Sequence, residues 1–73
     1  MIIITGASRG IGNAIGKRLL HKNYKVLGLV RNPNDLEFDA VRCDVTDYES
    51  IKNAYKQIKK IKEPVTGLIN VAG

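Results

Sequence analysis

The sequence predicts an α/β fold in three layers, with a parallel sheet of about four strands between helices. Two uninterrupted aliphatic runs, Ile2–Ile4 and Val26–Val30, are typical of strands that are buried on both faces. Two other segments, one after each of the first and third predicted strands, repeat their apolar residues at helical spacing. Because strands that alternate with helices form parallel sheets with right-handed crossovers, these observations favour helices on both faces of the sheet.

The first helix is expected directly after the first strand. Apolar residues at positions 11, 14, 15 and 19 predict a helix from about Arg9 to Lys22. After the second strand, the cluster Asn32–Asp35 predicts a turn, and the short connection has room for a single helical turn at Pro33–Glu37. A short third strand is expected at Ala40–Cys43.

A capping box predicts the start of the second helix. Thr46 and Glu49 have the required spacing, which makes Thr46 the expected N-cap. Apolar residues at positions 51, 54, 55, 58 and 61 mark the buried face of this helix, and Pro64 is expected to end it. Gly67–Val71 then predicts a fourth strand.

We expect the sheet order 3-2-1-4, which places the first strand and its unbroken isoleucines inside the sheet. The order reverses after the third strand, so the second helix should lie on the opposite face from the first. Sheets of this kind bind ligands in the crevice at such a reversal, beyond the carboxyl ends of the strands. The fourth strand is left as an edge, and some of Ile3, Leu27, Leu29 and Leu68 should meet water or a partner. We therefore expect this edge to associate with another chain, for example by self-association.

Composition narrows the function classes. The 73 residues allow one small core and a single domain. The net charge is +5, but we expect the lysines of the second helix to form a solvated face without interleaved aromatic rings. Nucleic acid is therefore not an expected partner. No apolar run approaches the roughly 20 residues that span a bilayer, and the start has no basic leader. The single Cys43 fits a reducing, cytoplasmic location.

Three glycines between the first strand and the first helix predict an anion-binding turn. Gly6 permits the tight turn, Gly10 lets the backbone approach a pyrophosphate, and Gly12 allows close packing of helix and strand. A helix N-terminus at this place offers free N–H groups and a partial positive charge to phosphates. A plain glycine-rich turn remains the alternative explanation of the spacing alone.

The segment Thr5–Gly12 resembles the TGxxxGIG motif of the short-chain dehydrogenase/reductase family, whose cofactor domain is Rossmann-like. Cys43–Asp47 is similar to the family's D-V-[TS]-[DN] segment, and Ile69–Gly73 resembles its N-N-A-G segment, with Val71 in place of the second asparagine. The three motifs occur in order, each at the end of a predicted strand. The resemblance covers the whole chain but only the first part of a family member. It therefore implies a fold that is incomplete relative to the full family fold, in which the fourth strand would pair with a missing C-terminal half.

The resemblance implies a role for each matched residue. Gly6, Ala7, Ser8, Arg9, Gly10, Ile11 and Gly12 would wrap the phosphates and the adenosine ribose. Asp44 would accept a hydrogen bond from the adenine amino group, with Val45 beside the ring. Asn70, Val71, Ala72 and Gly73 would line the ribose and nicotinamide side. Asp44 could instead serve the helix start, and Asn70 could satisfy backbone groups at the strand end.

The family's catalytic serine, tyrosine-x-x-x-lysine pair and asparagine lie beyond the fourth strand, so we expect no catalytic residue in this chain. Two pairs have the tyrosine–lysine spacing, Tyr48 with Lys52 and Tyr55 with Lys59, but both precede the fourth strand. Core packing is the expected role of Tyr55. His21 is expected to be exposed and Cys43 buried, and no metal site is expected.

The cofactor is expected to be NADP(H) rather than NAD(H). Arg31 follows the second strand, where an acidic residue would bind the ribose 2′-hydroxyl of NAD, and Asp35 comes several residues later. Arg31 and Arg9 could hold a 2′-phosphate. The expected function is the NADP(H)-binding part, residues 1–73, of an oxidoreductase that transfers hydride between nicotinamide and a carbonyl or alcohol. The alternative is a non-catalytic nucleotide-binding or assembly module.

Overall fold

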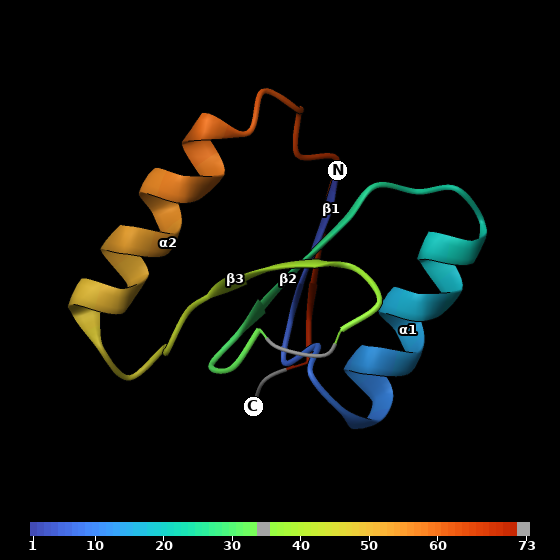
Figure 1. Ribbon diagram of the computed structural model, residues 1–73, viewed down its shortest axis with the longest axis horizontal. Coiled ribbons are helices and arrows are strands. Elements are labelled where there is room, and N and C mark those ends of the chain that lie inside the picture. The colour runs from blue at the N-terminus through green and yellow to red at the C-terminus, as the bar shows by residue number, and fades with distance from the viewer. Residues whose placement is uncertain (34–35, 72–73) are drawn as a thin grey trace.

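The computed structural model describes residues 1–33 and 36–71, which form a parallel four-stranded sheet with a helix on each face (Figure 1). The elements in chain order are β1 (Ile2–Thr5), α1 (Gly10–His21), β2 (Val26–Val30), β3 (Asp39–Arg42), α2 (Tyr48–Lys60) and β4 (Gly67–Asn70). The strand order is β3-β2-β1-β4, as expected, and each pairing is parallel. The expected strands therefore all occur, with bounds that differ by a residue.

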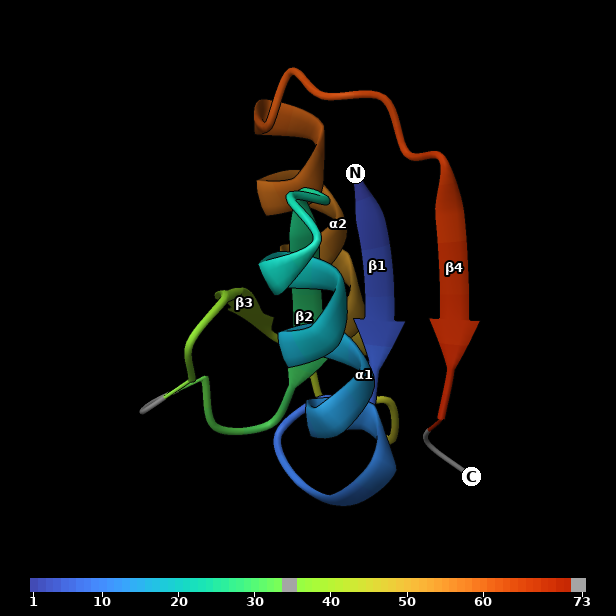
Figure 2. The ribbon, with the colours of Figure 1, turned by 90° about the vertical axis from the view of Figure 1, so that its right-hand side faces the viewer.

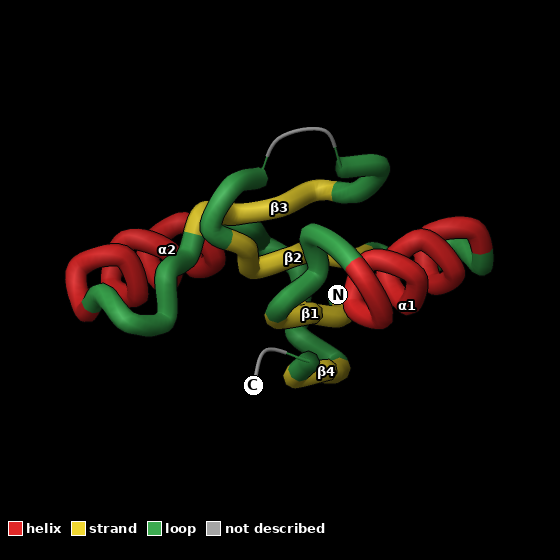
Figure 3. Tube along the Cα trace, turned by 90° about the horizontal axis from the view of Figure 1, so that it is seen from below, coloured by secondary structure: helices red, strands yellow, loops and turns green. Residues whose placement is uncertain are grey.

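The two helices lie on opposite sides of the sheet, as the reversal of strand order requires (Figure 3). Each side has its own apolar cluster because successive β1 side chains point to opposite faces. Ile4, which is fully buried, packs on the α1 side with Val26 and Phe38. Ile3 packs on the α2 side with Leu27 and Ala54.

Strand β4 is an edge within the described part of the chain, where it pairs only with β1 (Figure 2). Leu68 on this strand is 66% exposed, whereas Ile3 and Leu27 are buried. The expected incomplete cover of the sheet is thus found at Leu68 and, in part, at the half-buried Leu29.

Phe38 fixes the distance between α1 and the sheet. Its ring lies where a Cβ on Gly16 or Gly28 would sit: such a Cβ would come within 2.6 Å of the ring from Gly16 and 3.1 Å from Gly28. The ring thus fills the space between the helix and β2.

The helical turn expected at residues 33–37 falls partly outside the described residues, and Leu36 and Glu37 are not helical.

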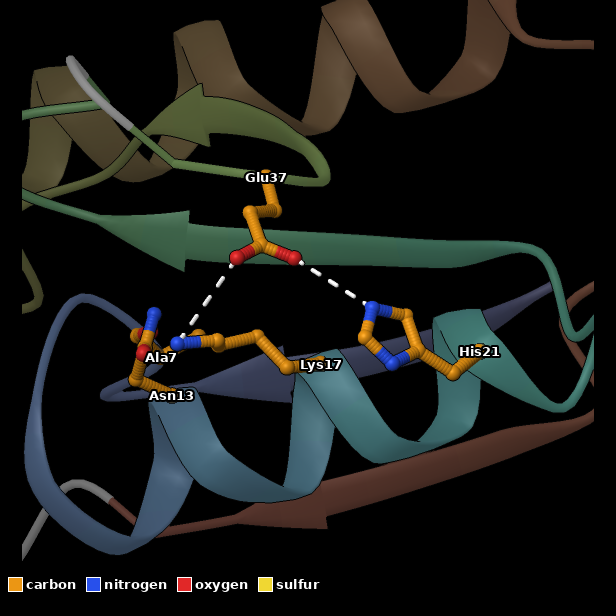
Figure 4. Close-up of polar contacts among 5 residues, drawn as sticks. All are labelled: Ala7, Asn13, Lys17, His21 and Glu37. Carbon is orange, nitrogen blue, oxygen red and sulfur yellow. Dashed lines mark hydrogen bonds and ion pairs between the residues drawn. The ribbon is translucent and has the colours of Figure 1, made fainter.

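Glu37 ties the same segment to α1 on the surface. Its two carboxylate oxygens lie 3.7 Å from Lys17 Nζ and 3.4 Å from His21 Nε2 (Figure 4). The side chain of His21 is 69% exposed, as expected. Exposed pairs of this kind add little stability, so Phe38 is the main anchor.

The N-cap of α2 is Asp47, and the expectation of Thr46 is wrong. The side chain of Asp47 accepts a hydrogen bond from Glu49 N at 3.1 Å. The hydroxyl of Thr46 instead donates to Asp44 Oδ1 at 2.7 Å. Threonine and aspartate both cap helices well. Here the Thr46 hydroxyl is engaged by the carboxylate of Asp44, so Asp47 caps the helix instead.

Other expectations for α2 also need correction. The helix ends at Lys60, with an extended Ile61 as C-cap, so it stops before Pro64. Tyr55 is 61% exposed and does not pack in the core. Lys59 Nζ lies 5.4 Å from the centre of the Tyr55 ring, and Lys52 Nζ lies 5.6 Å from that of Tyr48. Aromatic rings therefore do accompany the lysines.

We predict that Asp47→Ala lowers the free energy of unfolding by about 1 kcal/mol, the typical effect of losing an N-cap. For a domain of this size the melting temperature should fall by about 4–8 °C. Thermal denaturation followed by circular dichroism measures the change. Asn53→Ala, an exposed substitution on the same helix, is the control and should not destabilise the chain. Equal melting temperatures for Asp47→Ala and the wild type would show that Asp47 does not cap the helix.

Candidate cofactor-binding site

A cleft of about 1110 Å³ lies at the carboxyl ends of the strands. Drug-sized ligands occupy pockets of about 300–1,000 Å³, so this cleft has room for a larger ligand. It is lined by Thr5, Gly6, Ser8, Arg9, Leu29, Val30, Arg31, Asn32, Cys43, Asp44, Val45, Thr46, Asn70 and Val71. The three motifs of the sequence thus meet at one place, as expected for a crevice at a reversal of strand order.

The glycine-rich turn has the tight bend at Gly6 and the close packing at Gly12 that the spacing predicted. Gly6 and Gly10 have φ angles of 65° and 62°, which side chains other than glycine rarely adopt. A Cβ on Gly12 would collide with the Gly6 carbonyl and lie 3.2 Å from Ala7 Cα. Only glycine at position 12 therefore lets α1 start this close to the end of β1.

The N-terminus of α1 has no side-chain cap. Arg9 is the N-cap residue and makes no capping hydrogen bond with its side chain. No acidic residue lies in the first turn, so the partial positive charge of the helix is not offset there. Ser8, Arg9 and Gly10 are exposed, and Ile11 is 72% exposed. This end of α1 is therefore open to an anion from solvent.

Asp44 is a half-buried carboxylate in the cleft. Its Oδ1 accepts hydrogen bonds from Thr46 N at 3.0 Å and Thr46 Oγ1 at 2.7 Å. These bonds lower the pKa of the Asp44 carboxyl below its ordinary value, and the charges of Arg31 and Arg42 lower it further. The carboxyl group is therefore ionised and accepts hydrogen bonds at neutral pH.

We predict that Thr46→Val raises the pKa of Asp44 toward its ordinary value because it removes the stronger of the two contacts. A carboxyl whose pKa falls on folding adds stability above its unfolded pKa, and this stability is lost as pH falls through the folded pKa. The wild type should therefore keep the contribution of Asp44 to lower pH than the variant. A carbon-13 NMR titration of the carboxyl group measures both pKa values. An unchanged titration midpoint in Thr46→Val would refute the assignment.

Thr5 links the ends of β1 and β4 at the cleft. Its hydroxyl donates to Asn70 Oδ1 at 2.6 Å and accepts from Val71 N at 3.2 Å. The side chain of Asn70 thus takes part in joining the strands through the hydroxyl of Thr5, and it is Thr5 that satisfies the backbone N–H at the end of β4. Ala72 and Gly73, the remaining expected site residues at this end, lie outside the described residues.

Two arginines line the same cleft. Arg9 and Arg31 are exposed, and within residues 1–33 and 36–71 neither side chain forms an ion pair or a hydrogen bond. Arg31 lies close enough to Asp44 to lower the pKa of that carboxyl. Both guanidinium groups are therefore available to an anionic ligand. Asp35, the other charged residue considered for this place, is outside the described residues.

The model of the short chain dehydrogenase family matches residues 1–73. The chain belongs to the short chain dehydrogenase family. It is 36% identical to the 3-oxoacyl-[acyl-carrier-protein] reductase MabA of Mycobacterium avium, over 99% of this chain and 29% of that protein. It is 34% identical to the NADPH-dependent 3-dehydrocapnine reductase of Ornithobacterium rhinotracheale, over 97% of this chain and 29% of the relative.

The fold also matches a solved structure of 4-hydroxyisoleucine dehydrogenase complexed with NADH and succinate. The TM-score is 0.85 at 38% identity, over 100% of this chain and 35% of that one. The chain thus spans about a third of the length of these short chain dehydrogenases. Family membership and the Rossmann-like architecture are both established by these matches.

One polar residue that supports the candidate site was not predicted from the sequence. Ser50 on α2 is buried, with 4% of its surface exposed, and its hydroxyl contacts the backbone of Asp44. A serine on the buried face of an amphipathic helix was the available signal. Cys43 is buried as expected and lines the cleft.

The described residues contain no group of three or more His, Cys, Asp or Glu side chains placed to hold a metal ion. Within the same part of the chain, no helix is long and apolar enough to cross a membrane.

Proposed function

We propose that residues 1–73 form the dinucleotide-binding segment of a short chain oxidoreductase and that the cofactor is NADP(H). The observation that carries the proposal is the uncapped N-terminus of α1 beside two positive-φ glycines in a cleft of about 1110 Å³. Phosphates bind at such helix ends through free N–H groups and the helix dipole. The reaction served would be hydride transfer between nicotinamide and a carbonyl or alcohol, with the hydride supplied by the cofactor.

The proposed contacts follow the positions of the residues in the cleft. Gly6 to Gly12 would surround the pyrophosphate and the adenosine ribose. The Asp44 carboxylate would accept a hydrogen bond from the adenine amino group. Val45, which is 63% exposed, would pack beside the ring. Asn70 to Gly73 would line the nicotinamide side. The oxidoreductase family is established for this chain, whereas these individual contacts are part of the proposal.

Selectivity for NADP(H) is proposed from the chain's own residues because the relatives differ. One is named for NADPH, and another was solved with NADH. Arg31 and Arg9 line the cleft and form no ion pair or hydrogen bond with the described residues, so their positive charges can pair with a 2′-phosphate. The residue directly after β2, where an acidic side chain would bind a 2′-hydroxyl, is Arg31 itself.

Nucleotide titration of the purified chain tests the proposal. NADPH at one hundred times its dissociation constant should stabilise the fold by about 2.7 kcal/mol and raise the melting temperature. NADH should bind about tenfold or more weakly, since one charge-assisted hydrogen bond contributes about 1.5–3 kcal/mol. A melting temperature that neither nucleotide changes would contradict dinucleotide binding. Equal affinities would contradict the selectivity alone.

A non-catalytic nucleotide-binding or assembly module is the second candidate, and the free edge of β4 favours it. Edge strands with exposed apolar side chains such as Leu68 pair readily with another chain. We predict concentration-dependent association, measured by sedimentation velocity. A monomer at high protein concentration would contradict the predicted association.

The buried, free Cys43 supports a reducing, cytoplasmic compartment as part of the same proposal.

The proposal assigns no catalytic residue to this chain. Tyr48 and Tyr55 lie on α2 and are absent from the lining of the cleft, so neither is placed to donate a proton to a substrate beside the nicotinamide. The chain should therefore not oxidise NADPH with a panel of ketones. Turnover that disappears in Tyr48→Phe or Tyr55→Phe would overturn this assignment.

A further inference from the structure

Ser50 is a buried polar residue whose partners all belong to the segment before α2. It lies in the first turn of the helix, and 4% of its surface is exposed. Its Oγ accepts a hydrogen bond from Asp44 N at 2.8 Å and a longer one from Arg42 Nη1 at 3.5 Å. Ser50 thus connects the helix directly to the residue that carries the carboxylate of the cleft.

The two oxygens of Asp44 have different surroundings. Oδ1 accepts both hydrogen bonds from Thr46. Within the described residues, Oδ2 accepts no hydrogen bond from the protein. Asp44 lines the cleft, so Oδ2 is the oxygen available to a ligand. Its position depends on where the backbone of Asp44 is held, and Ser50 holds that backbone.

A ligand atom at Oδ2 must be a hydrogen-bond donor. The exocyclic amino group of adenine donates, whereas the 6-oxo group of hypoxanthine only accepts and would face the carboxylate with like polarity. A site built to pair a polar group rejects the analogue that lacks the partner. The discrimination requires the carboxylate to be fixed opposite C6, because a mobile Asp44 could turn away from the oxo group and accept a hydrogen bond from the neighbouring N1–H, or let water bridge the two groups.

We propose that Ser50 is a positioning residue that fixes Asp44 in the cleft and thereby sets selectivity for 6-amino over 6-oxo purine dinucleotides. This rests on the proposed function, in which Asp44 meets the adenine ring. Removing the Ser50 hydroxyl leaves the part-buried Asp44 N–H without its acceptor. Because an unpaired buried N–H is costly, the backbone at Asp44 should shift until this group binds another acceptor or water. The carboxylate then loses its fixed position, although Thr46 still holds Oδ1.

The experiment compares NADPH with reduced nicotinamide hypoxanthine dinucleotide phosphate, in which the purine carries an oxo group at C6 and a proton on N1. Fluorescence titration gives the dissociation constant of each for the wild type and for Ser50→Ala. The wild type should bind NADPH about tenfold more tightly than the analogue. In Ser50→Ala the ratio should fall to about one or two, through weaker binding of NADPH and with little change for the analogue.

Two further variants separate positioning from general stability. Ser50→Cys has almost the same size but a weak acceptor, so it should fold and also lose most of the ratio. Thr66→Ala removes a hydroxyl that contacts Met1, away from the cleft-lining residues. It should lower the melting temperature and leave the ratio at the wild-type value. If Ser50→Ala does not fold, the result for Ser50→Cys decides.

The outcomes distinguish this inference from the proposed function. A wild-type ratio that persists in Ser50→Ala and Ser50→Cys overturns the positioning role and leaves dinucleotide binding intact. A wild type that binds both nucleotides equally overturns the positioning role as well, because there is then no selectivity to set. A wild type that binds neither overturns both proposals. Loss of the ratio in both Ser50 variants, with Thr66→Ala unchanged, supports the positioning role.

Discussion

Replacing Gly12 with alanine is expected to abolish cooperative folding of the chain. The new Cβ would collide with the Gly6 carbonyl and press on Ala7 Cα at 3.2 Å. Both neighbours are backbone, so relief requires moving α1 away from the end of β1. Overpacking of this kind costs about 1–3 kcal/mol or more. A core of this size supplies only about 3–5 kcal/mol in total.

Urea denaturation followed by far-ultraviolet circular dichroism measures this effect. Gly67→Ala is the matched control because it adds the same methyl group in β4, where the Cβ would lie 3.6 Å from Ile2 Cγ1 in ordinary contact. Gly67→Ala should keep the wild-type transition, since alanine also lowers the entropy of the unfolded chain. A Gly12→Ala variant that unfolds at nearly the wild-type urea concentration would show that the β1–α1 turn can yield.

The parts of the fold that the sequence predicted are those set by patterns within short segments. The unbroken isoleucines of β1 are typical of a strand buried on two faces, and they suit its place inside the sheet in the observed order. The spacing of Gly6, Gly10 and Gly12 likewise reflects constraints on the local backbone. The structure shows positive φ angles at Gly6 and Gly10, and no room for a Cβ at Gly12. The meeting of the motifs in one cleft then followed from topology.

The buried face of α2 was predicted only in part, because its exact position depends on how the helix packs on the sheet. The sheet-facing stripe is Ser50, Ala54, Ile58 and Ile61, and this leaves Ile51 and Tyr55 at its margin. A pattern search that counts apolar residues includes Tyr55 and omits a serine. The choice of Asp47 over Thr46 as N-cap was similarly decided outside the capping box, by Asp44 two residues earlier.

Arg31→Ala is expected to remove most of the preference for NADPH over NADH. Arg31 lines the cleft at the end of β2, and its guanidinium forms no ion pair or hydrogen bond among the described residues. A charge-assisted hydrogen bond to phosphate contributes about 1.5–3 kcal/mol, so the affinity for NADPH should fall about 10- to 100-fold. The affinity for NADH, which lacks the 2′-phosphate, should change little.

Arg18→Ala is the matched control for this loss of charge. Arg18 is an exposed arginine in the last turn of α1, at the opposite end of the helix from the cleft. Its removal lowers the net charge equally but should leave the ratio of the two affinities unchanged. Salt provides a second readout, because screening of an exposed arginine–phosphate pair should reduce the wild-type preference as ionic strength rises.

If Arg31→Ala and Arg18→Ala gave the same affinity ratio, the selectivity would have to come from Arg9 or from the backbone of the glycine-rich turn. Arg9→Ala, which also lines the cleft, would then be expected to show the loss in place of Arg31→Ala.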